Sequence, residues 1–151
     1  MELEKLSYEQ IKSFSGKEFV DYIADNGFFT DLDDLLKYGH FIKVIYKVMD
    51  YETVFSNFGL EAVIKDKDCT PLNETVEALR SVGASEYAEI LSELNEYLLS
   101  VNALDNLSEN EHIMSVINEY EERLSNKKSE MDQTFFMLMY SYADKQLKSL
   151  K

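Results

Sequence analysis

Apolar residues recur every three or four positions along most of the chain, which is the spacing of one face of an α-helix. The clearest run predicts a helix over residues 40–57, whose apolar face carries Phe41, Val44 and Ile45. Lys47 and Asp50 fall on the opposite side of this helix. Residues 58–64 add another helical turn or two, and residues 66–70 are expected to form a polar loop.

Residues 71–82 and 86–101 are predicted to form a tight helical hairpin with a connection of about three residues. Pro71 suits the first helical position, where a backbone N–H would have no partner. Gly83 is expected to end the first helix and Ser85 to cap the second. The apolar stripes of the two helices consist of Leu72, Val76 and Leu79, and of Ala88, Leu91, Leu94 and Leu98.

Four more helices follow from the same spacing. One ends near residues 26–27, and a short one is capped by Thr30 and closed by Gly39. A third opens with a capping box from Ser108 to Glu111 and stops at a polar, basic break over residues 125–129. The last covers about residues 130–150. Its first half is apolar on almost every side, so we expect it to be central or covered by a second subunit.

The composition supports an all-α fold. One proline and five glycines in 151 residues are few for a sheet protein with many turns. The length corresponds to one domain, and 45% hydrophobic residues are enough for a core. We therefore predict an all-α, single compact domain over residues 1–151, with about six to eight helices.

The charge narrows the range of partners. The chain carries a net charge of −14, which disfavours nucleic acid and anionic membrane surfaces. From Glu74 to Glu122 there are twelve acidic residues and a single base, Arg80. Glu-rich helix faces also occur merely to keep proteins soluble, so the acids permit either interpretation.

Four of these acids share a helix face. Glu86, Glu89, Glu93 and Glu96 step by three, four and three residues, which places successive carboxylates roughly 5 Å apart along the axis. One DNA strand carries a phosphate every ~3.4 Å of axis. The row is thus within a factor of two of the charge spacing of a DNA strand.

Catalytic and metal-binding motifs are not recognisable. His112 belongs to half of a carboxylate-bridged di-iron motif with Glu109, but His40 lacks the matching glutamate. Cys69, the only cysteine, has an acidic neighbour that raises a thiol pKa and leaves less thiolate. We therefore expect no enzyme activity, no metal and no cofactor.

A set of hairpin positions follows a recognisable pattern: Glu74, Ala78, Leu79, Gly83, Ala84, Ala88 and Leu91. In these positions the chain resembles a bacterial family of acidic helical domains known chiefly for a DNA-mimic protein. The resemblance covers residues 46–99, and the turn at Asn57-Phe58-Gly59 stands where the family has Asn-Gly-Gly-Phe. It implies an all-α fold, a dimer, and a protein that occupies a DNA-binding protein in place of DNA.

From the sequence we predict a non-enzymatic, cytoplasmic interaction protein that docks on a basic DNA-binding partner. The alternatives are an immunity or inhibitor protein against a basic toxin such as a nuclease, and an acidic helical module of unknown role. A homodimer through residues 131–142 is a separate expectation. The residues predicted to bind the partner are Glu74, Glu77, Glu86, Glu89, Glu93, Glu96, Glu119, Glu121 and Glu122.

Overall fold

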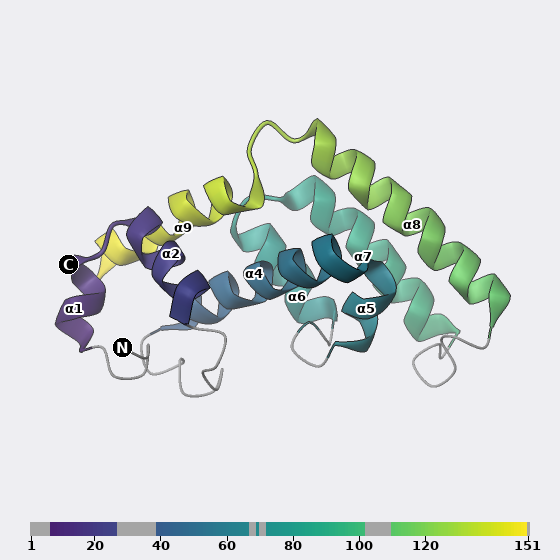
Figure 1. Ribbon diagram of the computed structural model, residues 1–151, viewed down its shortest axis with the longest axis horizontal. Coiled ribbons are helices and arrows are strands. Elements are labelled where there is room, and N and C mark those ends of the chain that lie inside the picture. Colours follow the sequence, from purple (N-terminus) through teal and green to yellow (C-terminus); the bar gives the residue numbers. More distant parts are fainter. Residues whose placement is uncertain (1–6, 27–38, 67–68, 70–71, 102–109, 151) are drawn as a thin grey trace.

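The computed structural model describes residues 7–26, 39–66, 69, 72–101 and 110–150, and within these ranges it contains eight helices and no strand (Figure 1). The prediction of an all-α fold is confirmed. The short helix expected after Thr30 lies outside the described residues. The helices are α1 (Tyr8–Ser13), α2 (Gly16–Asn26), α4 (His40–Phe58), α5 (Leu60–Lys65), α6 (Leu72–Ser81), α7 (Ser85–Ser100), α8 (Glu111–Glu130) and α9 (Phe135–Ser149).

Helix α4 lies at the centre, in contact with α2, α5, α6 and α9. From Phe41 to Tyr51 its side chains are buried apart from the half-buried Lys43. Lys47 and Asp50, expected opposite the apolar face, are only 4% and 9% exposed. The two-sided pattern of this helix is therefore misleading, because neighbouring helices cover both sides of it and its buried polar groups find partners there.

Aromatic packing joins α4 to α7 and α9. The hydroxyl oxygens of Tyr51 and Tyr87 lie 2.5 Å apart in a buried hydrogen bond. The Phe135 ring packs edge-on against both tyrosine rings, with centroids 6.5 and 5.0 Å away. Tyr87 directly follows Glu86, so this buried contact sets which side of α7 faces outward.

The predicted hairpin is confirmed as α6 and α7. Gly83 takes a φ of 98°, a left-handed conformation that favours glycine, and it connects the two helices. The expected role of Ser85 is wrong. Ala84 occupies the N-cap position without a side-chain hydrogen bond, and Ser85 is already the first residue of α7.

Helix α8 is longer than predicted. It begins at Glu111, and the Asn110 side chain accepts hydrogen bonds from the first-turn N–H groups of His112 and Ile113. Ser108, the expected cap, lies outside the described residues. The helix continues to Glu130, so the break predicted over residues 125–129 is wrong. Tertiary contacts of the lysines in this segment, described below, stabilise its helical form.

Helix α9 begins at Phe135 rather than near residue 130, with Thr134 as its N-cap. Its apolar first half is explained mainly within the chain, because α2 and α4 pack against it. At Gly16 the contact is so close that a Cβ atom would lie 2.1 Å from the Tyr140 carbonyl oxygen. Within residues 131–142, Met137 is the one large hydrophobic side chain that is exposed.

No helix within the described ranges is both long and apolar enough to cross a membrane.

Candidate protein-interaction surface

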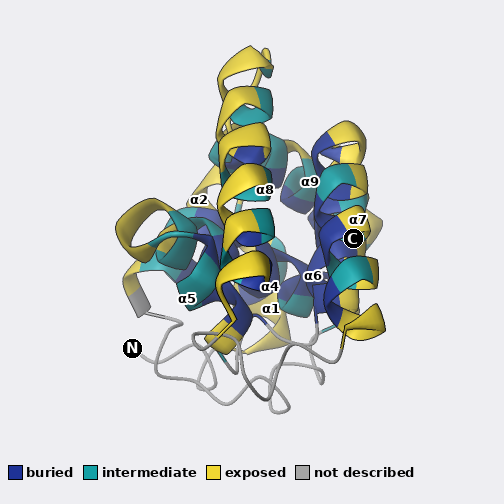
Figure 2. Cartoon of the chain, turned by 90° about the vertical axis from the view of Figure 1, so that its right-hand side faces the viewer, coloured by how far each residue is buried: buried dark blue, intermediate teal, exposed yellow. Residues whose placement is uncertain are grey.

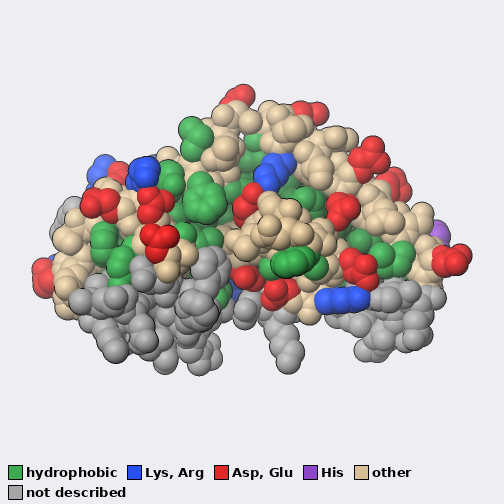
Figure 3. All heavy atoms as spheres, in the orientation of Figure 1, with side chains coloured by type: hydrophobic (Ala, Val, Ile, Leu, Met, Phe, Trp, Pro, Cys, Tyr) green, Lys and Arg blue, Asp and Glu red, His purple; other side chains and the backbone are tan. Residues whose placement is uncertain are grey.

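Helices α7 and α8 pack side by side and present most of the predicted site residues. In Figure 2, α8 faces the viewer between α5 and α7, and its outer side is exposed. Acidic side chains follow the edge of the molecule along α8 in Figure 3. On α7, the carboxylates of Glu86, Glu89, Glu93 and Glu96 are all exposed, as their spacing predicts.

Most of the α7 row is paired with cations of the same chain. Lys127 Nζ lies 2.5 Å from a Glu86 carboxylate oxygen, and Arg123 lies 3.2 Å from Glu93. Both cations come from α8. Arg123 and Lys127 lie just beyond Glu122, where the acidic stretch of the sequence ends. They become neighbours of the row only because α8 packs on α7.

Arg80 of α6 binds two carboxylates at once. Its two terminal nitrogens each lie 2.5 Å from a carboxylate oxygen, one of Glu77 and one of Glu89. We call Glu77, Glu86, Glu89 and Glu93, together with Arg80, Arg123 and Lys127, the paired end of the surface. Four carboxylates there face three cations, so little negative charge is left over.

The pairing is visible in the proton affinities at this end. The hydrogen bond from Lys127, followed by its charge, lowers the pKa of the Glu86 carboxyl below its ordinary value. The same hydrogen bond raises the pKa of Lys127. Glu86 nevertheless remains 82% exposed, so solvent screens this interaction and a partner can reach the carboxylate.

Three predicted residues form a contrasting group, which we call the open end: Glu96 of α7 and Glu119 and Glu122 of α8. All three are exposed, and none of them forms an ion pair with another described residue. The two helices are antiparallel, since Glu86 meets Lys127 and Glu93 meets Arg123. Continuing this register brings Glu96 level with the turn of α8 that contains Glu119.

Glu121 has a different role from its neighbours. It is half-buried, and its carboxylate accepts a 2.6 Å hydrogen bond from the backbone N–H of Leu60 at the start of α5. Gly59 lies so close that a Cβ atom there would be 2.6 Å from the same oxygen. The structure thus uses Glu121 to attach α5 to α8, a function its position in an acidic run did not suggest.

Glu74 also faces another helix. Its two carboxylate oxygens lie 3.5 Å from Lys43 and from Lys47, both of α4. These residues line a groove of about 150 Å³ between α4 and α6. Glu74 therefore balances lysine charge at α4.

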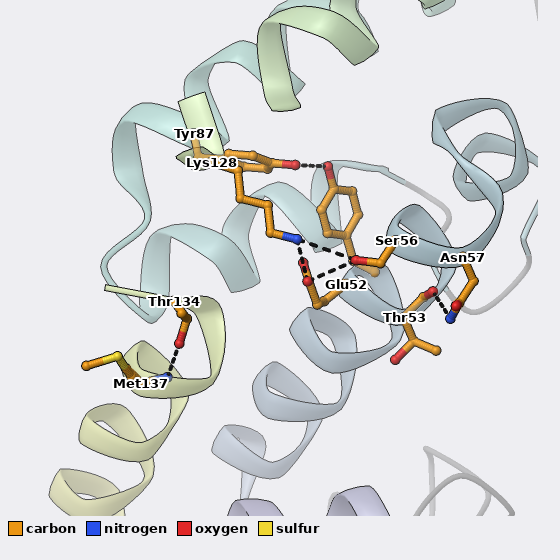
Figure 4. A network of polar contacts seen from close by, with 9 residues as sticks. Glu52, Thr53, Ser56, Asn57, Tyr87, Lys128, Thr134 and Met137 are labelled. Carbon is orange, nitrogen blue, oxygen red and sulfur yellow. Dashed lines mark hydrogen bonds and ion pairs between the residues drawn. The ribbon is translucent and has the colours of Figure 1, made fainter. Parts of the chain in front are cut away.

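A network of polar contacts joins α8 to α4, on a different side of α8 from its contacts with α7 (Figure 4). Lys128 forms an ion pair with Glu52, and its ammonium also lies 3.4 Å from the Ser56 hydroxyl oxygen. Lys127 and Lys128 thus connect neighbouring positions of one helix to α7 and to α4. Sequence reasoning treated both lysines as part of a break and missed these contacts.

Among the described residues, one group that is buried except for the half-buried Asp66 brings together side chains of the types that bind metal ions. Asp50, Asp66 and Cys69 bring one ligand atom each to within 4.8 Å of one another. However, burial, followed by the hydrogen bond to Asp50, raises the pKa of the Cys69 thiol well above its ordinary value. The charge of the buried Lys47 also acts on this thiol, and an ammonium beside the donors opposes a second cation. The residues present do not fit a metal centre well.

Fold and surface together define an acidic, all-helical protein that offers exposed carboxylates on a pair of antiparallel helices. The chain belongs to the DMP19-like protein family, whose model matches residues 39–149, nearly three quarters of the sequence. The match extends the resemblance of residues 46–99 through α8 and α9, whereas α1 and α2 precede it. Neither curated proteins nor solved structures gave a match.

Proposed function

We propose that this chain is a non-enzymatic DNA mimic whose α7–α8 surface occupies the DNA-binding surface of a basic protein partner. Membership in the DMP19-like family supports a protein of the DNA-mimic type. The observation that carries the proposal is the open end, where Glu96, Glu119 and Glu122 are exposed and have no cation among the described residues.

The physical basis is exchange of one anion for another. A DNA-binding surface presents arginines and lysines spaced for phosphates, and carboxylates accept the same charge-assisted hydrogen bonds. Carboxylates roughly 5 Å apart along α7 come close enough to this spacing for several to be engaged together. The net charge of −14 would also speed the encounter with a basic partner.

The remaining predicted residues contribute unequally in this proposal. Glu77, Glu86, Glu89 and Glu93 can bind a partner's cation by exchanging or sharing their own. Two others, Glu74 and Glu121, are assigned mainly to holding helices together. The surface is therefore centred on the open end and widened by the paired end.

A homodimer through residues 131–142 is a further part of the proposal. The exposed Met137 lies two residues from the start of α9. Nearby, a hollow of about 420 Å³ is lined by Met131 and Leu138 and otherwise mostly by polar and charged side chains, Glu86 and Lys127 among them. A second copy would cover the apolar side chains of this region. We also propose that the chain acts in the cytoplasm as a single domain, where DNA-binding partners are found.

The decisive experiment is capture of a partner from a bacterial lysate at low salt, with elution by a salt gradient. The captured protein should itself bind DNA, and this chain should displace DNA from it in a competition assay. Sedimentation of the free chain and of the complex gives the stoichiometry, including a dimer at micromolar concentration. Binding that does not weaken with salt, or a complex that binds DNA undisturbed, would contradict mimicry. Inhibition of a captured nuclease would instead favour the immunity function.

A further inference from the structure

The corner between α4 and α5 exposes an aromatic ring. Phe58, the last residue of α4, is 75% exposed, the largest value among the big hydrophobic side chains described. Single exposed hydrophobic residues are common and need no explanation by themselves. The reason to single out Phe58 is the way in which the chain holds it there.

Hydrogen bonds within the corner fix its backbone. Gly59 takes a φ of 88°, and its N–H donates a 3.0 Å hydrogen bond to the Phe55 carbonyl oxygen. The Asn57 side chain donates to the Thr53 carbonyl oxygen at 2.8 Å. Phe58 lies between these two bonds, so the ring extends from an ordered turn.

Helix α8 holds the same corner from both sides. Glu121 accepts the Leu60 N–H, just after Phe58, and Lys128 binds Glu52 and Ser56, just before it. A corner attached at two points of α8 has little freedom to turn the ring inward. The exposure of Phe58 is therefore built into the packing of α4 on α8.

The corner that carries this ring meets α8 at Glu121, which directly precedes Glu122 of the open end. Successive residues of a helix are rotated by about 100° around its axis. Starting from Glu121, which faces α5, Glu122 lies about 100° around the axis of α8 and faces solvent. Glu119 lies about 160° around in the same direction and faces α7. Figure 2 shows the same order, with α5 and α7 on either side of the exposed face of α8. The exposed face therefore runs from the α4–α5 corner past Glu122 and Glu119 toward Glu96.

We propose that Phe58 is the apolar anchor of the acidic surface, and that it inserts into an apolar pocket at the edge of a partner's basic DNA-binding surface. The proposal rests on the proposed function and adds an apolar contact, which has no counterpart in the phosphate backbone of DNA. Interfaces gain most of their affinity from a few buried anchors, aromatic residues prominent among them, while the surrounding charges steer and orient.

Charge selects this occupant over others. A second copy of the chain seated on Phe58 would bring Glu119 and Glu122 against carboxylates of its own kind. Nucleic acid and anionic membranes are repelled in the same way. A basic protein surface satisfies the carboxylates and the ring together.

The test replaces two exposed aromatic residues of this chain, one at a time, and measures binding to the partner captured as described above. Phe58→Ala should weaken binding to that purified partner about tenfold or more, mostly through faster dissociation. The dependence of the affinity on salt should stay unchanged, because no charge is lost. Tyr8→Ala is the matched control, since Tyr8 is exposed on α1 at the opposite end of the molecule and should have no effect.

Photocrosslinking gives an independent readout. Benzoylphenylalanine in place of Phe58 should crosslink to apolar residues of the partner that are flanked by lysine or arginine. Wild-type affinity of Phe58→Ala together with normal salt-dependent binding would overturn the anchor and leave the proposed function standing, and a crosslink to a second copy would also overturn the anchor. If the wild-type chain captures no protein that salt releases, the proposed function fails and the anchor fails with it.

Discussion

The two ends of the α7–α8 surface share a sequence pattern and differ in charge. At the paired end, Arg80, Arg123 and Lys127 occupy carboxylates that the primary structure shows as a bare acidic row. At the open end, Glu119 and Glu122 have no cation among the described residues. The spacing of acids along a helix therefore does not determine the electrostatic potential around that helix. The potential depends on where the neighbouring helices place their lysines and arginines.

The difference has energetic consequences. Solvent screens exposed ion pairs, so the paired end helps only modestly to hold α6, α7 and α8 together. Carboxylates that repel one another weaken a helix by a few tenths of a kcal/mol per pair. A free carboxylate can bind an external lysine without first losing a partner, and for this reason the proposal centres partner binding on the open end.

The sharpest test removes charge from each end separately. Replacing Glu96, Glu119 and Glu122 with glutamine should weaken partner binding roughly 100-fold at low salt, at about 1 kcal/mol for each ion pair with the partner that is lost. It should also flatten the salt dependence. Glutamine at Glu86, Glu89 and Glu93 is the matched control and should cost less than about tenfold. Calorimetry measures both affinities. An equal loss of affinity in the two triple variants would contradict the distinction between the open end and the paired end.

Adjacent residues of α8 allow a test of fold against surface. Glu121→Ala removes the acceptor for the Leu60 N–H and should lower the free energy of unfolding by about 1–2 kcal/mol. Glu122→Ala, at an exposed position, should change it by less than about 0.5 kcal/mol. Urea denaturation of both variants measures this difference, and similar stabilities would show that the contact with α5 is dispensable.

The smallest effect concerns proton binding at the paired end. Because Lys127 lowers the pKa of Glu86 in the folded chain, the pair stabilises the fold above the unfolded-state pKa of Glu86. That contribution is lost as the pH falls through the folded-state pKa. In Lys127→Ala the pKa of Glu86 should rise toward its ordinary value. An NMR titration that shows no change would mean that the ion pair is not populated in solution.

Secondary structure was largely predictable here because it depends on local spacing. Heptad-like apolar spacing located α4 and the hairpin of α6 and α7 to within a few residues. The errors were at caps and breaks, where local preferences are weak. Residues 125–129 contain polar, weakly helix-forming side chains, yet their lysines bind Glu86 and Glu52 on other helices, and these contacts carry α8 through to Glu130.

The acidic surface was predictable only in part. The sequence alone determined that four α7 glutamates share one exposed face and that the chain is strongly acidic, because side-chain direction repeats with the helix and charge is a property of composition. Tertiary structure decided which carboxylates form no ion pair, that Glu121 accepts the Leu60 N–H of α5, and that the Phe58 ring is exposed. Those outcomes depend on residues 30 to 76 positions apart being brought within a few ångströms, and such contacts leave no signal in local spacing.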